Sequence, residues 1–362
     1  MKIGIVGLPQ SGKTTLFSAL TGQQVDIEGF VGGKKDAHQA IVKVPDDRLE
    51  QLNEIYKPKK KTLATVDYVD LSGLGTSTQK KGAFSDQFLA QIRIVDAILI
   101  IVRVFKNAQV IHPLETIDPG RDLDHVQAEF ILADLSIIEN RMDRLERQMK
   151  SKKNEQDMRE FELLQRFKDA LENEIPLRQL ELSSNEELMV RGYQFLTLKP
   201  LLIVPNIDED QISDTEAVIN DLSEWQEPQT RLVPISAQIE MEMQQLSESE
   251  AEVFRDDLGI THSAMDVLIR ASYDLLGLNS FFTVGEDEVR AWTVRNGTKA
   301  PEAAGEIHSD IERGFIRAEV VHYDEFIKRK SLAVCRTDGV LRLEGREYTV
   351  SDGDIINFRF AV

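Results

Sequence analysis

An eight-residue stretch near the N-terminus constrains the fold of this chain more than any other feature. It matches the pattern G-x-x-x-x-G-K-[ST], follows the apolar run 3–6 directly, and consists of Gly7, Leu8, Pro9, Gln10, Ser11, Gly12, Lys13 and Thr14. Successive backbone N–H groups in such a loop form a concave anion site, and the helix that follows adds the positive end of its dipole. The sequence therefore predicts a phosphate-binding loop between a strand and a helix.

The residue types in this stretch have chemical reasons. We expect the Lys13 ammonium to reach the β- and γ-phosphates and the Thr14 hydroxyl to take one Mg²⁺ position. Glycine is needed at positions 7 and 12, because a Cβ would block either the turn or the approach of phosphate oxygens. Chance matches to the pattern occur in roughly one chain in a hundred of this length, so a simple surface turn is the weaker reading. The predicted nucleotide contacts of the loop are Gly7, Pro9, Gln10, Ser11, Gly12, Lys13, Thr14 and Thr15.

Length and composition limit the class of protein. The 362 residues allow two or three domains, and no apolar run approaches the ~20 residues of a membrane span. Residues 1–4 lead straight into the first expected strand, so we expect no signal peptide and no membrane partner. The single cysteine, Cys335, excludes an internal disulfide and fits a reducing cytoplasm.

Charge restricts the possible partners. The chain has 43 basic and 62 acidic side chains, a net charge of −19, which opposes a polyanion. Contact with nucleic acid must then use local basic patches, and we expect no DNA sequence specificity. The candidate patches are the lysine-rich runs 57–61 and 150–154, although the first is more often a solvated face.

A second strand, 65–70, ends in the pattern D-x-x-G, formed by Asp70 and Gly73. Asp70 can hold Mg²⁺ through water, and the Gly73 N–H can bond the γ-phosphate. The pattern is informative because it stands 57 residues after Lys13 at the end of a strand. Helix 84–95 and a buried strand at 97–102 continue the alternation, which predicts an α/β fold with a doubly wound sheet and ligand at the carboxyl ends of its strands.

A helical hairpin is predicted to interrupt this sheet. Ile131, Leu135, Ile138, Met142, Leu145 and Met149 follow a heptad spacing, and a second amphipathic run ends at Pro176. The seam reads as the core of the pair, with a partner-helix site as the alternative. Residues 184–187 read as a capping box. The sheet resumes at 201–204, and the chain is β-rich after residue 279. The predicted domains are therefore 1–123 with 198–278 for nucleotide binding, 124–197 as the helical insertion, and 279–362 as a small α+β module.

These motifs together resemble the YchF-type ATPases among the Obg-related P-loop proteins. Beyond the phosphate loop, the resemblance rests on residues 70–74, 87–93, 206–209, 289–293 and 314–320, and it spans nearly the whole chain. It implies a P-loop domain with an α-helical insertion and a C-terminal TGS domain of β-grasp fold. It also implies ATP hydrolysis and association with the ribosome or ribosomal RNA.

The base-reading positions favour adenine over guanine. A GTPase uses N-K-x-D, whose aspartate accepts from guanine, whereas Glu209 and Ile207 stand at the aspartate and lysine positions here. The extra methylene misplaces the carboxylate, although the adjacent Asp208 leaves the selectivity open. Asn206 could still bond the purine edge, and Ser236, Ala237 and Gln238 form the second expected base loop.

Three positions bear on hydrolysis and its regulation. Leu74 replaces the glutamine that orients water in many GTPases, so the rate should be slow or use another group. The resemblance points to a histidine after the next strand, which His112 matches; a loop histidine bonded to backbone is an equal alternative. Residues 30–39 lack the threonine and cysteine usual in the first switch of the family. Gln10 replaces the usual asparagine of the phosphate loop, so the resemblance does not extend to a monovalent-cation requirement, and that question stays open.

The leading hypothesis is a slow Mg²⁺-dependent ATPase that times contact with a ribosome or RNA partner. A GTPase of the same fold is the second hypothesis. An adaptor that binds RNA or the ribosome, with nucleotide as a structural ligand, is the third. A P-loop small-molecule kinase is least favoured, because residues 70–73 and the C-terminal module have no role in it.

Overall fold

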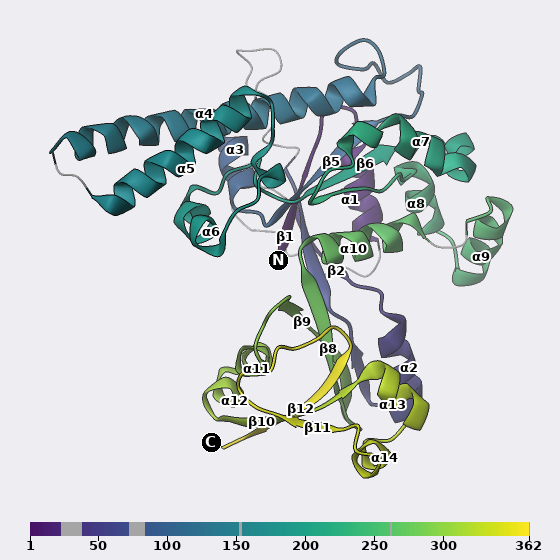
Figure 1. Cartoon of the computed structure of the whole chain (residues 1–362). Helices are drawn as coiled ribbons and strands as arrows, with labels where there is room; N and C mark the ends of the chain where they lie inside the picture. Colours follow the sequence, from purple (N-terminus) through teal and green to yellow (C-terminus); the bar gives the residue numbers. More distant parts are fainter. Residues whose placement is uncertain (23–37, 72–83, 152–153, 261–262, 362) are drawn as a thin grey trace. The chain divides into compact units, whose positions relative to one another are not determined.

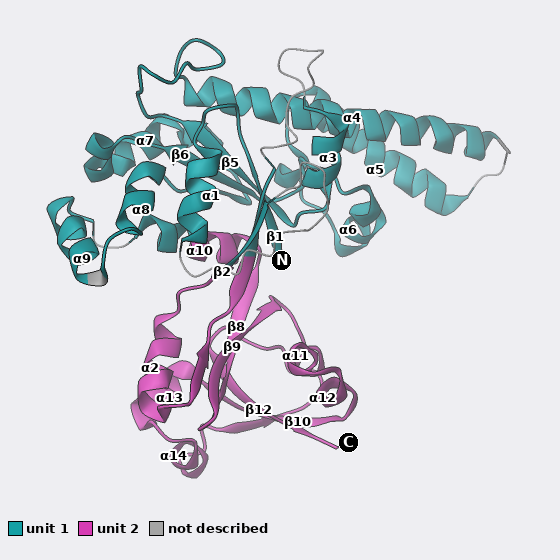
Figure 2. Ribbon diagram, turned by 180° about the vertical axis from the view of Figure 1, so that it is seen from behind, with its two compact units in different colours: residues 1–41, 67–268 teal, residues 42–66, 269–362 magenta. Residues whose placement is uncertain are grey.

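The computed structural model of the chain describes residues 1–22, 38–71, 84–151, 154–260 and 263–361 (Figure 1). The chain folds into two compact units, each containing segments far apart in the sequence (Figure 2). Unit 1 comprises residues 1–41 and 67–268, and unit 2 comprises residues 42–66 and 269–362. Two six-stranded sheets organise the described residues.

The first sheet has the strand order β2-β4-β1-β5-β6-β7, and every pairing from β4 to β7 is parallel. Its strands are β1 (Lys2–Val6), β2 (His38–Lys43), β4 (Thr65–Asp70), β5 (Ala97–Arg103), β6 (Leu201–Asn206) and β7 (Thr230–Leu232). The central strands β5 and β6 are buried along their full length, which explains their continuous apolar sequences. The predicted doubly wound α/β fold is confirmed.

Helices follow most strands of this sheet, as the alternating sequence predicted. They are α1 (Lys13–Thr21), α3 (Asp86–Arg93), α7 (Thr215–Asp221), α8 (Ala237–Met243), α9 (Glu248–Asp257) and α10 (Ala264–Leu275). Helix α1 buries the predicted face, formed by Leu16, Ala19 and Leu20. No helix within the described ranges has the length and apolar character needed to cross a bilayer.

The predicted helical hairpin is present as α4 (Pro119–Ser151) and α5 (Glu155–Glu172), which lie side by side (Figure 1). Their shared core contains Ile138, Leu145, Leu164 and Phe167, all fully buried. Two ion pairs also join the helices: Arg141 with Glu160 at 2.8 Å and Lys168 with Glu139 at 3.0 Å. The heptad seam therefore packs within the hairpin, as the sequence predicted.

The predicted capping box at residues 184–187 is wrong by one residue. The Ser183 hydroxyl accepts from the Glu186 N–H, and the Glu186 carboxylate accepts from the Ser183 N–H at 2.8 Å. Ser184 is already the first residue of α6 (Ser184–Val190), so its backbone cannot serve as the cap. Short 3₁₀ segments occur at Leu177–Gln179, Arg191–Tyr193, Glu209–Asp214 and Ser223–Trp225.

The second sheet, in unit 2, has the order β11-β10-β12-β8-β9-β3. Its strands are β3 (Lys60–Thr62), β8 (Leu278–Val284), β9 (Glu288–Arg295), β10 (Phe315–His322), β11 (Arg342–Glu344) and β12 (Asp354–Phe360). The helices of the unit are α2 (Asp47–Tyr56), α11 (Ala300–Ile307), α12 (Ser309–Arg313), α13 (Tyr323–Arg329) and α14 (Leu332–Thr337). Alanines of α11 pack against Phe281, Phe315 and Phe358 to form its main core.

The β-rich pattern after residue 279 includes residues 348–350, which the sequence predicts as a further strand, but this strand does not form. At residues 348–350, only Thr349 makes an isolated bridge, to Lys299. The buried Asp354 carboxylate accepts from the Tyr348 hydroxyl at 2.7 Å and from the Ser351 N–H at 2.9 Å. These bonds turn the segment around one side chain and prevent an extended ladder.

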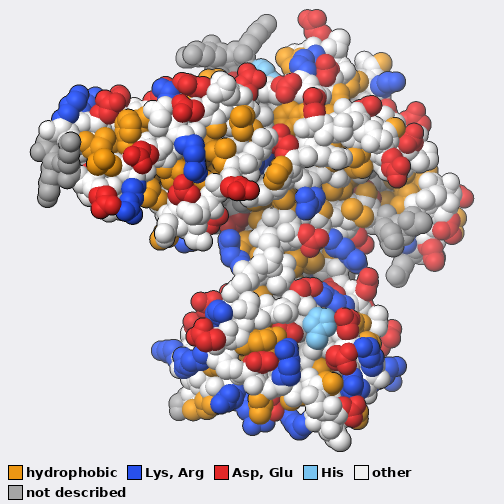
Figure 3. Space-filling model, viewed as in Figure 1, with side chains coloured by type: hydrophobic (Ala, Val, Ile, Leu, Met, Phe, Trp, Pro, Cys, Tyr) orange, Lys and Arg blue, Asp and Glu red, His pale blue; other side chains and the backbone are white. Residues whose placement is uncertain are grey.

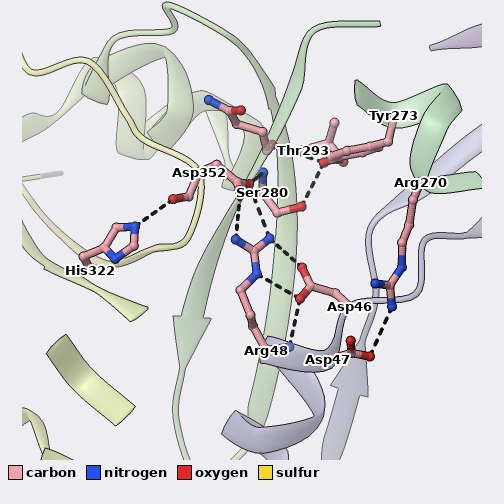
Figure 4. A network of polar contacts seen from close by, with 10 residues as sticks. Asp46, Asp47, Arg48, Arg270, Tyr273, Ser280, Thr293, His322 and Asp352 are labelled. Atoms are coloured by element: carbon pink, nitrogen blue, oxygen red, sulfur yellow. Dashed lines mark hydrogen bonds and ion pairs between the residues drawn. The ribbon is translucent and has the colours of Figure 1, made fainter. Parts of the chain in front are cut away.

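Residues 42–66 join the C-terminal residues in unit 2 through both backbone and side chains. Strand β3 pairs in parallel with β9, and Arg48 lies between Asp46, at 2.8 Å, and Asp352, at 2.6 Å (Figure 4). Asp352 also accepts from the Ser280 N–H, and the His322 ring bonds its backbone carbonyl. The sequence boundaries assigned 42–66 to the nucleotide-binding domain, whereas the compact units group it with 269–362.

We predict that the free energy of unfolding increases less with pH in the alkaline range in Lys199→Met than in the wild-type protein. Burial lowers the pKa of Lys199 to about 8, against a smaller opposing effect of Asp96, and its amine donates to the Val95 carbonyl at 2.6 Å. Between this value and its ordinary pKa of about 10.4, the unfolded chain binds the proton and the folded chain does not. Unfolding free energy should therefore rise with pH across this window, by at most about 3 kcal/mol from this group.

Urea unfolding at pH 7.5 and pH 9.5 measures this effect. Lys57→Met, at an exposed lysine, is the control and should keep the wild-type change between the two pH values. Equal slopes in wild type and Lys199→Met would show that the buried amine does not titrate in this window.

Candidate functional site

The two loop glycines are required by the backbone and side chains that approach them. Gly12 has φ 102°, in the left-handed region, and a Cβ there would lie 2.1 Å from the Asn206 Nδ2. A Cβ on Gly7 would lie 2.4 Å from the Ile101 carbonyl oxygen. The loop therefore lies directly against β5 and the end of β6. Glycine is required at both positions because a side chain would collide with these strands, in addition to the predicted need to leave room for phosphate.

Asn206 connects the phosphate loop to the second predicted base loop. Its Nδ2 donates to the Ser11 carbonyl at 3.0 Å, and its Oδ1 accepts from the Ala237 N–H at 3.0 Å. The side chain is buried at the last residue of β6. Sequence reasoning assigned Asn206 to the purine edge; the structure shows a clamp between two loops.

Lys13 lies folded against its own loop. Its ammonium donates to the carbonyls of Gly7 at 3.0 Å and Leu8 at 2.7 Å. Burial lowers the Lys13 pKa to about 8, and the negative charge of Asp70 partly opposes this shift. A triphosphate would replace these carbonyls with stronger, charged acceptors.

The two predicted metal-binding side chains are at the carboxyl edge of the sheet. Asp70 is buried at the end of β4, and its backbone pairs with Ile5 of β1, which runs into the phosphate loop. Thr14 is exposed in the first turn of α1. Hydroxyl and carboxylate oxygens are ligands that Mg²⁺ accepts together with phosphate oxygens and water.

The remaining loop residues differ in accessibility. Pro9 and Gln10 are exposed, whereas Ser11 is buried, and its hydroxyl has no hydrogen-bond partner among the described residues. Thr15 lies on the wall of the adjoining pocket. Gln10 has φ 63°, a strained conformation for a residue with a Cβ.

A pocket of about 310 Å³ adjoins the phosphate loop. It brings together Gly12 and Thr15 with the two predicted base loops. Its lining includes the predicted residues Asn206, Ile207, Glu209, Ser236 and Gln238; Ala237 contributes through its bond to Asn206. The predicted loops therefore converge on one cavity.

The two neighbouring carboxylates of this pocket have different partners. Asp208 accepts from the Lys106 N–H at 2.8 Å, and its own N–H donates to Gln211. Glu209 is exposed on the pocket wall at the start of a 3₁₀ segment. The carboxylate of Asp208, which has the side-chain length used in guanine recognition, is thus hydrogen-bonded to the protein backbone. The carboxylate of Glu209 is accessible from the pocket.

Sequence reasoning missed five residues of the pocket: Phe105, Lys106, Asn107, Ile239 and Glu242. The first three directly follow β5, so their position after a buried central strand was an available signal. Phe105 lies under the Arg103 guanidinium, 4.5 Å from the ring centroid, and Arg103 also donates to three carbonyls of this loop. Glu242 on α8 had no sequence signal.

Both ring nitrogens of His112 are hydrogen-bonded, one to the backbone of its own loop and one to the first turn of α4. Its Nδ1 accepts from the Leu114 N–H at 3.2 Å, so its Nε2 carries the proton and donates to Asp122 at 2.9 Å. The ring is buried, and Arg121 also contacts Asp122. This arrangement favours the structural reading of His112, because a role as general base requires at least the Nδ1 contact with Leu114 to break.

Several predicted functional positions lie outside the described residues. They are Gly73, Leu74, residues 30–37 of the first switch, and Lys152 and Lys153 of the hairpin tip. Their roles stay predictions. The described neighbours are Asp70 and Leu71 before the second switch, and His38 at the start of β2.

The lysine run 57–61 is mostly compensated by acidic side chains. Lys59 pairs with Asp287 at 2.7 Å, Lys60 with Glu288 at 3.3 Å, and Lys61 with Glu50 at 2.6 Å. Acidic and basic side chains accordingly alternate over much of the visible surface (Figure 3). The run is therefore a weaker polyanion site than its sequence indicates, and Lys150 stays exposed near the hairpin tip.

Comparisons with known proteins agree with this geometry. A family described as "50S ribosome-binding GTPase" matches residues 2–140, and YchF-GTPase_C, described as "Protein of unknown function (DUF933)", matches residues 278–361. The ribosome-binding ATPase YchF of Bacillus subtilis is 41% identical, with 99% of both chains covered. The protein of the same name from Escherichia coli O157:H7 is 38% identical over 100% of this chain and 99% of that one. The solved structure of the Schizosaccharomyces pombe YchF GTPase aligns with a TM-score of 0.87 and 32% identity, covering 99% of this chain and 97% of that one.

We predict that Asn206→Ala destabilises the protein even without nucleotide. The substitution leaves the Ser11 carbonyl and the Ala237 N–H without their partner, which costs about 1–3 kcal/mol for a buried group. Urea unfolding of the nucleotide-free protein measures this loss, with Asn220→Ala, at an exposed site on α7, as the control. Weaker nucleotide binding at unchanged stability would instead identify Asn206 as a base reader.

Proposed function

Because the chain belongs to the YchF family of P-loop nucleoside triphosphate hydrolases, we propose that it is a slow Mg²⁺-dependent ATPase. It binds ATP in preference to GTP and uses the bound nucleotide to regulate association with the ribosome or ribosomal RNA in the cytoplasm. The observation that carries the proposal is the base pocket, where Asp208 is bonded to the Lys106 backbone and Glu209 is the accessible carboxylate.

Two properties of the pocket favour adenine: it has apolar and aromatic surface for a purine, and its aspartate is not available to bind guanine. Guanine recognition requires a carboxylate of aspartate length that accepts from the ring N1–H and the exocyclic 2-amino group, whereas Asp208 accepts from the Lys106 N–H instead. Ile207 is buried, so its side chain supplies apolar surface where a GTPase has lysine. Phe105 adds an aromatic wall for the purine. A site without a carboxylate placed to accept from guanine loses much of its preference for guanine over adenine.

The phosphate end of the site supplies charge stabilisation. Backbone N–H groups of the phosphate loop other than Pro9 and the N-terminus of α1 bind phosphate oxygens, and Lys13 neutralises charge that develops on the β,γ-bridge. Thr14 and Asp70 would hold Mg²⁺, which supplies electrostatic stabilisation to the transferred phosphoryl group. We assign no residue to the orientation of water, since both ring nitrogens of His112 are already hydrogen-bonded within the protein. We expect slow turnover because no described residue is assigned to orient the attacking water.

Two alternatives keep specific support. The relative from Schizosaccharomyces pombe is named a GTPase, so GTP use belongs in the first binding measurement. The buried contacts of His112 favour an adaptor whose nucleotide is mainly structural. Both alternatives share the ribosome association that we propose from the names of the relatives and the matched family.

We predict that ATP binds at least several-fold more tightly than GTP in the presence of Mg²⁺. Glu209→Asp should narrow this difference, because it shortens the accessible carboxylate toward the length used for guanine. Titration calorimetry of both nucleotides against both proteins provides the measurement. Equal or tighter binding of GTP by the wild-type protein contradicts the proposed specificity.

We predict wild-type turnover of roughly 10⁻⁴ to 10⁻² s⁻¹ without a partner, by comparison with unassisted P-loop switches. Lys13→Ala should abolish hydrolysis and weaken ATP binding, because the bridging oxygen loses its cation. His112→Ala separates the two readings of that residue in the same single-turnover assay. A slower rate at unchanged unfolding free energy supports catalysis, whereas lower stability at an unchanged rate supports the structural role.

A further inference from the structure

Unit 2 has one sheet surface where three arginines gather around a single acidic side chain. We define the arginine face as Arg317 of β10, Arg359 of β12 and Arg336 of α14, with Glu319 and Asn357 between them. All three arginines are exposed, and Glu319 is the one acidic residue of the face. The opposite face of the same sheet packs against α11 and is apolar.

Strand register places two of these arginines directly opposite each other. Arg317 pairs with Arg359 across β10 and β12, next to an irregularity between residues 315 and 317. Like charges in this position destabilise a sheet. Arg317 has no ion pair within the described part of the chain, and fold stability therefore does not account for its charge.

Glu319 holds the other two guanidinium groups in fixed positions. Its buried carboxylate accepts from Arg336 at 2.9 Å, from Arg359 at 2.5 Å and from Asn357 at 3.0 Å. Burial raises the pKa of Glu319, but these donors outweigh it and the net shift is downward, so the carboxylate stays charged. Each of the two guanidiniums uses only its Nη2 in this contact and keeps most of its N–H donors for another acceptor.

The charge distribution of the whole chain favours this unit as the polyanion contact. Unit 2 contains 19 basic and 20 acidic side chains, whereas unit 1 contains 24 basic and 42 acidic ones. A polyanion is therefore repelled by unit 1 and meets nearly balanced charge on unit 2. The face itself carries a net charge of +2.

We propose that the arginine face binds the phosphate backbone of RNA, and that this is the contact through which the protein associates with ribosomal RNA. The inference rests on the proposed ribosome association and specifies its surface and chemistry. Arginine suits this role because its planar donors bind phosphate oxygens in pairs, and Glu319 orients two of the three in advance. Ile316 and Leu343, 55% and 59% exposed, flank the face and can contact sugar and base surfaces.

The test compares Arg317→Glu with Arg313→Glu in the full-length protein. Arg313 is an exposed arginine on α12 of the same unit, outside the arginine face, and its reversal makes the same change in net charge. Binding to protein-free ribosomal RNA is measured by filter retention at several salt concentrations, and binding to intact ribosomes by co-sedimentation with a non-hydrolysable ATP analogue. The expected result is a loss of about tenfold or more in RNA affinity for Arg317→Glu and less than twofold for Arg313→Glu. Arg317→Ala should reduce the logarithmic salt slope by about 0.7–0.9.

Thermal unfolding separates binding from a structural role. Arg317→Glu places a carboxylate opposite Arg359, so its unfolding temperature should equal or exceed that of wild type while its RNA affinity falls. Equal effects of the two reversals would overturn the proposal, as would loss of ribosome binding without any loss of RNA binding, which would indicate an acidic ribosomal protein. If the wild type binds RNA but not ribosomes, the proposed ribosome association is contradicted, whereas the proposal that the arginine face binds RNA is retained.

Discussion

The amide of Asn206 is the contact on which the nucleotide site depends. One side chain satisfies the Ser11 carbonyl and the Ala237 N–H, and it fits because Gly12 has no Cβ. Both loops are thereby attached to the end of β6, a buried strand. Their relative position does not depend on the flexible chain between them. A site held on rigid elements keeps its geometry before the ligand arrives, which lowers the cost of binding.

The unequal charge of the two units suits their separate tasks. Unit 1 can carry a large acidic excess and still bind a triphosphate, because most of its phosphate contacts come from backbone N–H groups at short range. A contact with a polyanion extends over a wide surface, so the field of many side chains acts on it. The balanced charge of unit 2 and its exposed arginines meet that requirement, whereas Lys59, Lys60 and Lys61 are already paired with carboxylates.

Sequence predicted what depends on local pattern. The strands of the first sheet, the phosphate loop and the hairpin core follow from continuous apolar runs, glycine spacing and a heptad repeat, and the structure contains them. The clamp role of Asn206 required knowing which loops meet at one strand end. The bond between Asp208 and the Lys106 backbone, and the Arg317–Arg359 register, join residues distant in the chain, so no local pattern encodes them. The capping box shifted by one residue because Ser183 and Ser184 offer the same chemistry.

The discontinuous make-up of unit 2 has a consequence for biosynthesis. Strand β3 and helix α2 are made early, but their partners β8, β9 and Asp352 follow more than two hundred residues later. Leu49 and Leu52, fully buried in the finished unit, therefore lack their native neighbours on β8 and β9 until the residues after 278 have been translated. Pairings of such sequence separation close slowly and leave apolar surface accessible in the meantime. Unit 2 is thus completed only after β12 has left the ribosome, and the apolar residues of α2 are accessible to chaperones until then.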